Sequence, residues 1–255
     1  MTTRDEPWPQ GTPCWIDGMV PDLQVGREFY AGLFGWEMVD TGPESGGYTI
    51  AKLSGRPVAG IGEPPPDNEM PPVWTTYIAV DDVEAIAARA RELGGEVLME
   101  PMDVMDEGRM AIVADPTGAV FGLWQQRNHR GAEIYNEPGA LTWNECMTRD
   151  YSRAGKFYTD LFGYTAEEVG DDGMKYSVLY LDGSPIGGLG ELGADMPADI
   201  PPHWMSYFAV ADADDTVKRA SELGAQVRMP PMDTPYGRLA VLAGPQGEMF
   251  AVIAG

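Results

Sequence analysis

The sequence contains an internal repeat, and this repeat constrains the fold more than any other feature. Trp15 and Trp143 begin two stretches whose residues match in the same order and at nearly the same spacing. The matched pairs include Asp22 and Asp150, Phe29–Tyr30 and Phe157–Tyr158, Tyr48 and Tyr176, Trp74 and Trp204, Tyr77 and Tyr207, Pro101–Met102–Asp103 and Pro231–Met232–Asp233, and Gly108–Arg109 and Gly237–Arg238. Self-similarity of this kind is the signature of a duplicated structural unit. We therefore expect two domains, residues 1–127 and 138–255, with a polar linker at about 126–139.

Each copy has the same predicted order of elements twice. An apolar run ends at Asp22, which suits the N-cap of a helix that buries Phe29 and Tyr30, and Gly35 suits the end of this helix. Strand-like runs follow at 36–39, 48–53 and 58–61. The pattern restarts with a strand at 73–80, a helix between Asp82 and Gly94, and strands at 96–99, 110–114 and 120–124. This order predicts an α+β fold of four βαβββ modules.

Composition excludes several classes of partner. The chain has 40 acidic and 17 basic residues among 255, which gives a net charge of −23. Such a charge repels phosphate backbones and anionic lipid, so we expect neither nucleic-acid nor membrane binding. The two cysteines, Cys14 and Cys146, do not occupy equivalent positions and predict no disulfide framework. With no apolar signal segment at the start of the sequence, we expect a cytoplasmic protein.

The motif Pro21–Asp22–Leu23, followed by Phe29–Tyr30 and Leu33–Phe34–Gly35–Trp36, resembles the vicinal oxygen chelate superfamily, and so does the closing turn at Asp115–Ala119. That superfamily includes glyoxalase I, extradiol dioxygenases, fosfomycin-resistance enzymes and bleomycin-resistance proteins. The paired tryptophans are similar to those of an actinobacterial two-domain group, which includes a glyoxalase-like mycobacterial antigen and antibiotic-cluster proteins labelled hydroxylases. The resemblance implies tandem glyoxalase-like domains whose modules form two cup-shaped mixed sheets.

The resemblance also implies where a divalent metal would bind. Superfamily enzymes hold it with a residue on the first strand, one on the strand that opens the second module, and one near the closing turn. The corresponding residues here are Trp15, Thr75 and Gly122 in the first copy and Trp143, Met205 and Ala251 in the second. None of them supplies an imidazole or a carboxylate. The chain's two histidines, His129 and His203, have no counterparts across the repeat, so surface or packing roles are favoured for them. We therefore expect no metal cofactor.

Side chains two apart on a strand face the same way, so Asp17 and Glu145 should enter the cups beside Trp15 and Trp143. Tyr77, Tyr207 and Trp124 share this orientation, and the small Gly122 and Ala251 would leave room. An indole beside a carboxylate suits a planar or cationic organic ligand. The alternative is that these tryptophans are core residues, as is common in sheets. Arg109 and Arg238 are expected to pair with Asp103 and Asp233 and to brace a loop. The alternative is that they hold an acidic group of a ligand.

Three functions follow from these patterns. The first is a metal-independent protein that binds an aromatic metabolite or antibiotic. Such a protein would have an accessory role in secondary metabolism or resistance. The second is an enzyme, a glyoxalase-like lyase, dioxygenase or hydroxylase, with a non-standard metal site or with Asp17 or Glu145 as general base. The third is an interaction module with collapsed cups. Because fusion already supplies two copies, we expect a monomer or a homodimer.

Overall fold

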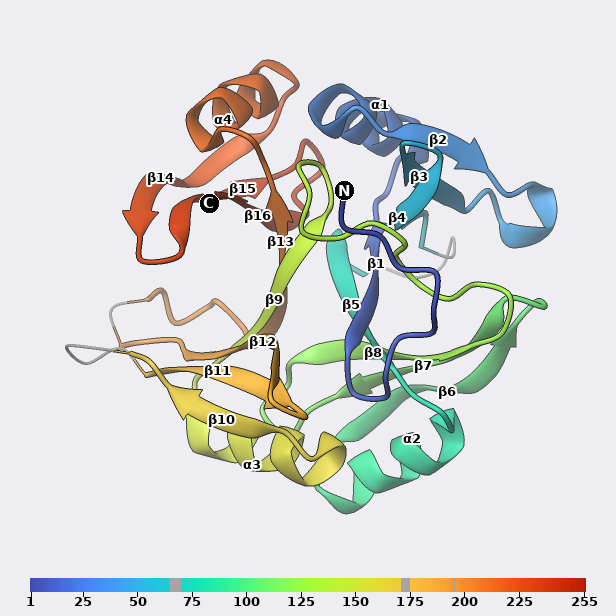
Figure 1. Ribbon diagram of the computed structural model, residues 1–255, viewed down its shortest axis with the longest axis vertical. Coiled ribbons are helices and arrows are strands. Elements are labelled where there is room, and N and C mark those ends of the chain that lie inside the picture. The colour runs from blue at the N-terminus through green and yellow to red at the C-terminus, as the bar shows by residue number, and fades with distance from the viewer. Residues whose placement is uncertain (65–69, 171–174, 195) are drawn as a thin grey trace.

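The computed structural model describes residues 1–64, 70–170, 175–194 and 196–255. Each half of the chain forms one eight-stranded sheet (Figure 1). The first sheet contains β1 (Pro13–Met19), β2 (Glu37–Asp40), β3 (Thr49–Leu53), β4 (Arg56–Gly62), β5 (Val73–Ala79), β6 (Glu96–Val104), β7 (Gly108–Ala114) and β8 (Val120–Gln126). The second contains β9 (Leu141–Thr148), β10 (Thr165–Glu168), β11 (Tyr176–Leu181), β12 (Ser184–Glu191), β13 (His203–Ala209), β14 (Gln226–Thr234), β15 (Gly237–Ala243) and β16 (Met249–Ala254). The helices are α1 (Leu23–Phe34), α2 (Val83–Glu92), α3 (Tyr151–Phe162) and α4 (Ala213–Glu222).

The strand order confirms the predicted modules. It is β2-β3-β4-β1-β5-β8-β7-β6 in the first sheet and β10-β11-β12-β9-β13-β16-β15-β14 in the second. The two modules of each sheet meet where β1 pairs antiparallel with β5, and β9 with β13. Each of these central strands also has a parallel neighbour, β4, β8, β12 or β16, so both sheets are mixed.

Local signals act as the sequence predicts. The Asp22 side chain accepts a hydrogen bond from the backbone N–H of Val25, and Gly35 ends α1 in the left-handed conformation with φ 71°. Asp82 caps α2 in the same way. The predicted strand at 96–99 is too short, because β6 continues to Val104. It passes Pro101 through irregularities in its pairing with β7, and apolar periodicity does not show such bulges.

The two sheets lie back to back and share their cores. Figure 1 shows α1 beside α4 and α2 beside α3, while β1, β5, β9 and β13 run through the middle of the molecule. Thr76 of β5 donates to the Asn144 Oδ1 atom of β9 at 2.7 Å. One apolar cluster joins Phe29 and Tyr30 of α1 to Phe208 and other residues of the second half. The domains are therefore packed as one molecule.

A matched pair of hydrogen-bonded chains crosses this interface. Trp74 Nε1 donates to Tyr30 Oη at 2.8 Å, and Tyr30 Oη donates to Glu248 Oε1 at 2.9 Å. On the other side, Trp204 donates to Tyr158 and Tyr158 donates to Asp115, both at 2.9 Å. Trp74 and Trp204 thus face helices, where they bond Tyr30 of α1 and Tyr158 of α3. None of the helices within the described part of the chain has the length and apolar character needed to cross a lipid bilayer.

Candidate functional site

Each sheet has a second face, turned away from the shared core, with its own apolar cluster. The face of the first sheet carries Trp15, Tyr77 and Trp124, and we call it cup 1. The face of the second carries Trp143, Met205, Tyr207 and Ala251, and we call it cup 2. Strand register places Trp15 opposite Tyr77 and Asp17 opposite Thr75. It likewise places Trp143 opposite Tyr207 and Glu145 opposite Met205, so the predicted site residues gather in two equivalent groups.

Each group contains one further tyrosine that was not predicted as a site residue, Tyr48 in cup 1 and Tyr176 in cup 2. Trp15 Nε1 donates to Tyr48 Oη at 3.1 Å, and Trp143 Nε1 donates to Tyr176 Oη at 3.0 Å. Both tyrosines stand at the start of the third strand of their module. The repeat matched Tyr48 with Tyr176, and that match was the available signal. Their side chains point into the cups because of how the strands pair, and this pairing cannot be predicted from the sequence.

In cup 2, Tyr176 and Tyr207 together donate hydrogen bonds to both oxygens of the Glu145 carboxylate. Tyr176 Oη donates to Glu145 Oε2 at 2.9 Å, and Tyr207 Oη donates to Glu145 Oε1 at 2.5 Å. Burial of the carboxyl group raises the pKa of Glu145, and the two hydroxyls oppose this shift. Burial and the neighbouring Glu145 charge also raise the pKa of Tyr176 and of Tyr207, so both phenols stay protonated and remain donors.

In cup 1, the carboxylate is more deeply buried and less well satisfied. Asp17 is only 5% exposed, and its Oδ1 atom has no hydrogen-bond partner among the described residues. Burial raises the pKa of Asp17 to about 7, while the hydroxyls of Tyr77 and Tyr48 oppose the shift. The Asp17 side chain is one methylene shorter than that of Glu145. The equivalent tyrosines therefore do not saturate it.

His129 lies in cup 1, although its place in the linker gave no sign of this. Its ring packs edge-on against Trp15, with centroids 4.3 Å apart, and it also contacts Trp124 at 5.5 Å. Trp124 Nε1 donates to the His129 carbonyl at 2.9 Å, which fixes this turn of chain. His129 Nε2 is buried and has no hydrogen-bond partner in the part of the chain that the structure describes, and burial lowers the pKa of the ring to about 4. The packing role expected for His129 is correct, but its partners are site residues.

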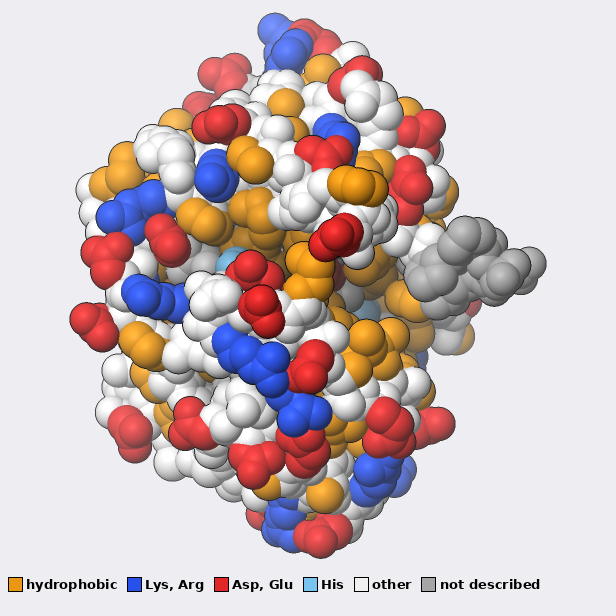
Figure 2. Space-filling model, turned by 90° about the vertical axis from the view of Figure 1, so that its right-hand side faces the viewer, with side chains coloured by type: hydrophobic (Ala, Val, Ile, Leu, Met, Phe, Trp, Pro, Cys, Tyr) orange, Lys and Arg blue, Asp and Glu red, His pale blue; other side chains and the backbone are white. Residues whose placement is uncertain are grey.

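The linker and the N-terminal segment cover cup 1. Trp8 Nε1 donates to the Ala132 carbonyl at 3.1 Å, and Thr3 pairs with Ile134. Under this cover Trp15 is only 3% exposed, whereas its counterpart Trp143 in cup 2 is half-buried. Figure 2 views the molecule from the side of the first half-chain and shows hydrophobic side chains gathered around the middle of this face, with charged side chains both beside them and toward the edges.

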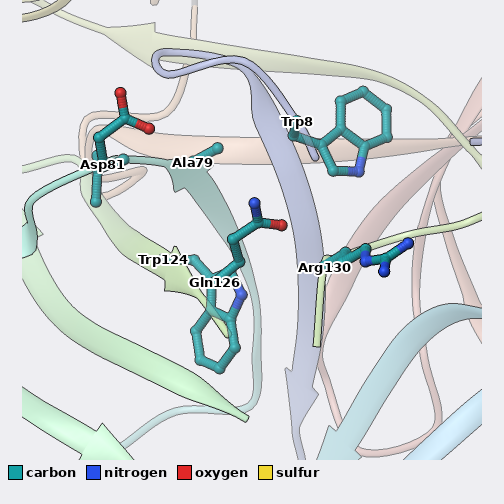
Figure 3. Close-up of a pocket in the computed structure, with 7 residues that line it drawn as sticks. Trp8, Ala79, Asp81, Trp124, Gln126 and Arg130 are labelled. Carbon is teal, nitrogen blue, oxygen red and sulfur yellow. The ribbon is translucent and has the colours of Figure 1, made fainter. Parts of the chain in front are cut away.

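A small cavity of about 20 Å³ lies at the edge of cup 1. Figure 3 shows Trp8 and Arg130 on one side of it, Ala79 and Asp81 on the other, and Trp124 and Gln126 between them. This volume is sufficient for about one water molecule. Cup 1 is therefore closed to larger molecules in this structure, and cup 2 is the more accessible of the two.

The late-strand arginines brace the outer parts of each sheet. Arg109 forms ion pairs with Asp103 at 3.1 Å and with Glu84, at the start of α2, at 2.5 Å. Arg238 repeats this arrangement with Asp233 at 2.9 Å and Asp214 at 2.5 Å. These contacts agree with the loop-bracing interpretation of both arginines.

Comparison with known proteins identifies the family. The model of the Glyoxalase/Bleomycin resistance protein/Dioxygenase superfamily matches residues 15–123 and 140–252, which are the two halves just described. The chain belongs to this superfamily. It is 43% identical to "Putative glyoxylase CFP32" of Mycobacterium tuberculosis (strain CDC 1551 / Oshkosh), over 99% of this chain and 98% of that protein. It is 40% identical to "Anthracycline biosynthesis protein DnrV" of Streptomyces peucetius, over 95% of this chain and 93% of that protein.

Solved structures of the superfamily share the fold at low identity. A Mn(II)-bound glyoxalase from Novosphingobium aromaticivorans aligns with a TM-score of 0.64 and 16% identity, over 96% of this chain and 83% of that one. The homoprotocatechuate 2,3-dioxygenase of Arthrobacter globiformis aligns with a TM-score of 0.67 and 16% identity, over 99% of this chain and 82% of that one. At such identity the likeness concerns the fold alone.

The superfamily's expected metal-ligand position on β8 is covered by a tyrosine ring. A Cβ atom at Gly122 would lie 2.2 Å from Cδ1 of Tyr77, so the missing side chain makes space for Tyr77 and leaves no open room. On β4, a Cβ atom at Gly60 would lie 1.7 Å from Tyr48 Oη, and at Gly188 of β12 it would lie 2.0 Å from Tyr176 Oη. Among the residues that the structure describes, no three His, Cys, Asp or Glu side chains gather as a metal site would require.

Proposed function

We propose that this superfamily member is a metal-independent binding protein for a small aromatic molecule. The observation that carries the proposal is the tryptophan–tyrosine–carboxylate group that stands in both cups. It occupies the region to which the superfamily resemblance assigns a metal. Both copies have it, with the same indole-to-phenol hydrogen bond at 3.1 and 3.0 Å.

The side chains of the cups do not fit a divalent metal. Catalytic metal sites in proteins use about three imidazole or carboxylate ligands. Cup 2 contains one carboxylate, and both of its oxygens already accept phenolic hydrogen bonds. Thr75, Gly122 and Ala251 stand at expected ligand positions and supply neither group. We derive no reaction step through a metal here.

The cups fit an aromatic ligand better. Indole faces stack on planar rings with about 0.5–1.5 kcal/mol beyond the gain from burial. Trp143 is partly exposed, so cup 2 offers an aromatic platform beside Glu145 and the two tyrosine hydroxyls that donate to it. The name of the relative DnrV places that protein in anthracycline biosynthesis, and a polycyclic aromatic ligand would suit the same platform. An aromatic metabolite or antibiotic is the ligand class that we propose.

Titration with 2-naphthol tests this proposal, because the compound is planar, neutral and a poor metal chelator. We expect saturable binding by calorimetry, weakened about tenfold in Trp143→Leu through the lost stacking and contact area. Trp204→Phe, which alters a tryptophan on the opposite face of the same sheet, serves as the matched control and should bind as the wild type does. Absence of saturable binding, or equal affinity in Trp143→Leu, would contradict the proposal.

A second function, metal-free general-base catalysis, is favoured by one observation. A carboxyl group with a pKa near 7 and a free oxygen is suited to accept a proton at neutral pH, and Asp17 in cup 1 has both properties. The closed state of cup 1 weighs against it, since a substrate must first reach Asp17. Turnover that is lost in Asp17→Asn while ligand binding persists would support the enzyme.

A further inference from the structure

Cup 1 contains a buried carboxylate without a counter-ion. Asp17 Oδ1 accepts no hydrogen bond from a described residue, and no described basic side chain forms an ion pair with Asp17. A buried carboxylate is costly unless it is paired, hydrogen-bonded or protonated. Glu145, its counterpart, is satisfied by two tyrosines. No ion pair of a described residue involves either acid, but only Asp17 has a carboxylate oxygen without a hydrogen-bond donor among the described residues, so the two cups differ chemically.

The aromatic side chains of cup 1 suit a cation. Trp15 stands two residues before Asp17 on the same face of β1, and Trp124 belongs to the same apolar cluster as Trp15. The negative face of an indole ring attracts ammonium groups, and the attraction is stronger where the pair is shielded from water. The net charge of −23 also raises the local concentration of cations and disfavours anions.

His129 provides a second polar contact for such a group. Its Nε2 atom is buried and has no hydrogen-bond partner among the described residues, and its ring is held against Trp15. The ring is neutral at physiological pH because burial lowers its pKa to about 4. A neutral imidazole has one nitrogen that accepts a hydrogen bond, and it does not repel a cation.

We propose that cup 1 binds the ammonium group of a small organic amine, with Asp17 as its counter-ion and His129 as a further hydrogen-bond acceptor. This inference rests on the proposed function, since it names the ligand chemistry of one of the two cups. Asp17 and Trp15 are only 5% and 3% exposed, so side chains that cover cup 1 must move for the amine to enter. Cup 2 does not share this preference, because the oxygens of Glu145 are already occupied.

The pH dependence of amine binding follows from the groups that face Asp17. Tyr48 and Tyr77 have raised pKa values through burial and stay neutral, as does Cys14. His129 is neutral above about pH 4. Asp17 is then the group of cup 1 that changes charge near pH 7. Binding should tighten about tenfold between pH 6 and pH 8, as the ionised fraction of Asp17 increases from about 0.1 to 0.9.

The test compares 2-phenylethylamine with 2-phenylethanol, which has a similar shape and no charge. By calorimetry, the amine should bind more tightly at pH 8 than at pH 6, whereas the alcohol should bind weakly and without pH dependence. Asp17→Asn should weaken amine binding at pH 8 by at least about tenfold and abolish its pH dependence. Glu96→Gln, which removes an exposed carboxylate on β6 outside the lining of the cup 1 cavity, should leave amine binding unchanged.

A second variant keeps the proposal falsifiable if Asp17→Asn does not fold. Asp17→Glu should reach the tyrosines as Glu145 does, and amine binding should decrease. Equal binding of amine and alcohol, or unchanged amine binding in either Asp17 variant, overturns the ammonium site. If 2-naphthol still binds through Trp143 in that case, the proposed function stands without this inference. If neither 2-naphthol nor the amine binds, both fail.

Discussion

Asp17 and Glu145 show how one methylene group changes the chemistry of a duplicated site. Both follow a cup tryptophan by two residues and both face two tyrosines. The longer Glu145 side chain accepts a hydrogen bond on each oxygen, whereas Asp17 Oδ1 accepts none from the described residues. The sequence predicted that both acids enter cups. It could not predict this difference, which depends on distances of about one bond length.

The raised pKa of Asp17 makes stability depend on pH. The folded protein holds the proton up to about pH 7, while the unfolded chain releases it near 3.8, so ionisation opposes folding as the pH increases through this range. Relative to Asp17→Asn, the free energy of unfolding of the wild type should decrease between pH 4 and pH 7, by up to about 4 kcal/mol. Urea denaturation of both proteins at several pH values measures this difference.

His129→Phe provides a control of opposite sign for the same measurement. The pKa of His129 is lowered, so the unfolded chain binds a proton between about pH 4 and 6.5 and the folded protein does not. The free energy of unfolding of the wild type, relative to that of His129→Phe, should increase with pH over that range by up to about 3 kcal/mol. A flat difference for Asp17→Asn would show that Asp17 is not buried as described.

At the scale of the strands, glycines allow tyrosines of neighbouring strands to fill the cups. The sequence analysis interpreted Gly122 as open room, but the ring of Tyr77 lies there. The close approach arises from the parallel pairing of β5 with β8, which places Tyr77 beside Gly122. Such a contact between strands distant in the sequence has no local signal, whereas the strands themselves were readable from their apolar patterns.

Gly122→Ala tests this close packing. Its Cβ atom would lie 2.2 Å from the Tyr77 ring, so the ring must move, and we expect a loss of about 1–3 kcal/mol in the free energy of unfolding. Tyr77→Ala combined with Gly122→Ala should recover the part of the loss that comes from this clash, as a double-mutant cycle would show. Gly155→Ala in α3 meets only Leu189 at 3.3 Å and should cost little. Equal effects of Gly122→Ala and Gly155→Ala would be incompatible with the packing of Tyr77.

At the scale of the whole molecule, duplication explains most of what the sequence predicted. Four modules, two sheets and the helix caps all follow from periodic patterns that occur twice. The two carboxylates at the interface, Asp115 and Glu248, do not come from equivalent positions of the repeat. Asp115 and Gly244 are equivalent in the closing turns, yet Glu248 supplies the second carboxylate, and its side chain occupies the space that a Gly244 side chain would need. Matching the two copies residue by residue therefore does not reveal that Asp115 and Glu248 accept equivalent hydrogen bonds in the folded protein.

The linker is the other feature that the repeat could not predict. His129 and Ala132 belong to neither copy, so no counterpart indicated that this segment covers cup 1. The cover makes the two cups differ in exposure as well as in chemistry. The molecule thus combines one accessible aromatic platform, cup 2, with one closed cup around a single carboxylate.

The most direct test of the central claim, that the cups bind small molecules without a metal, is a calorimetric titration with 2-naphthol before and after removal of metals. Protein treated with a strong chelator and dialysed into metal-free buffer should bind 2-naphthol with unchanged stoichiometry and affinity, and added Mn²⁺, Fe²⁺ or Zn²⁺ should change neither. Binding that disappears after chelation and returns on addition of one of these ions would contradict the claim.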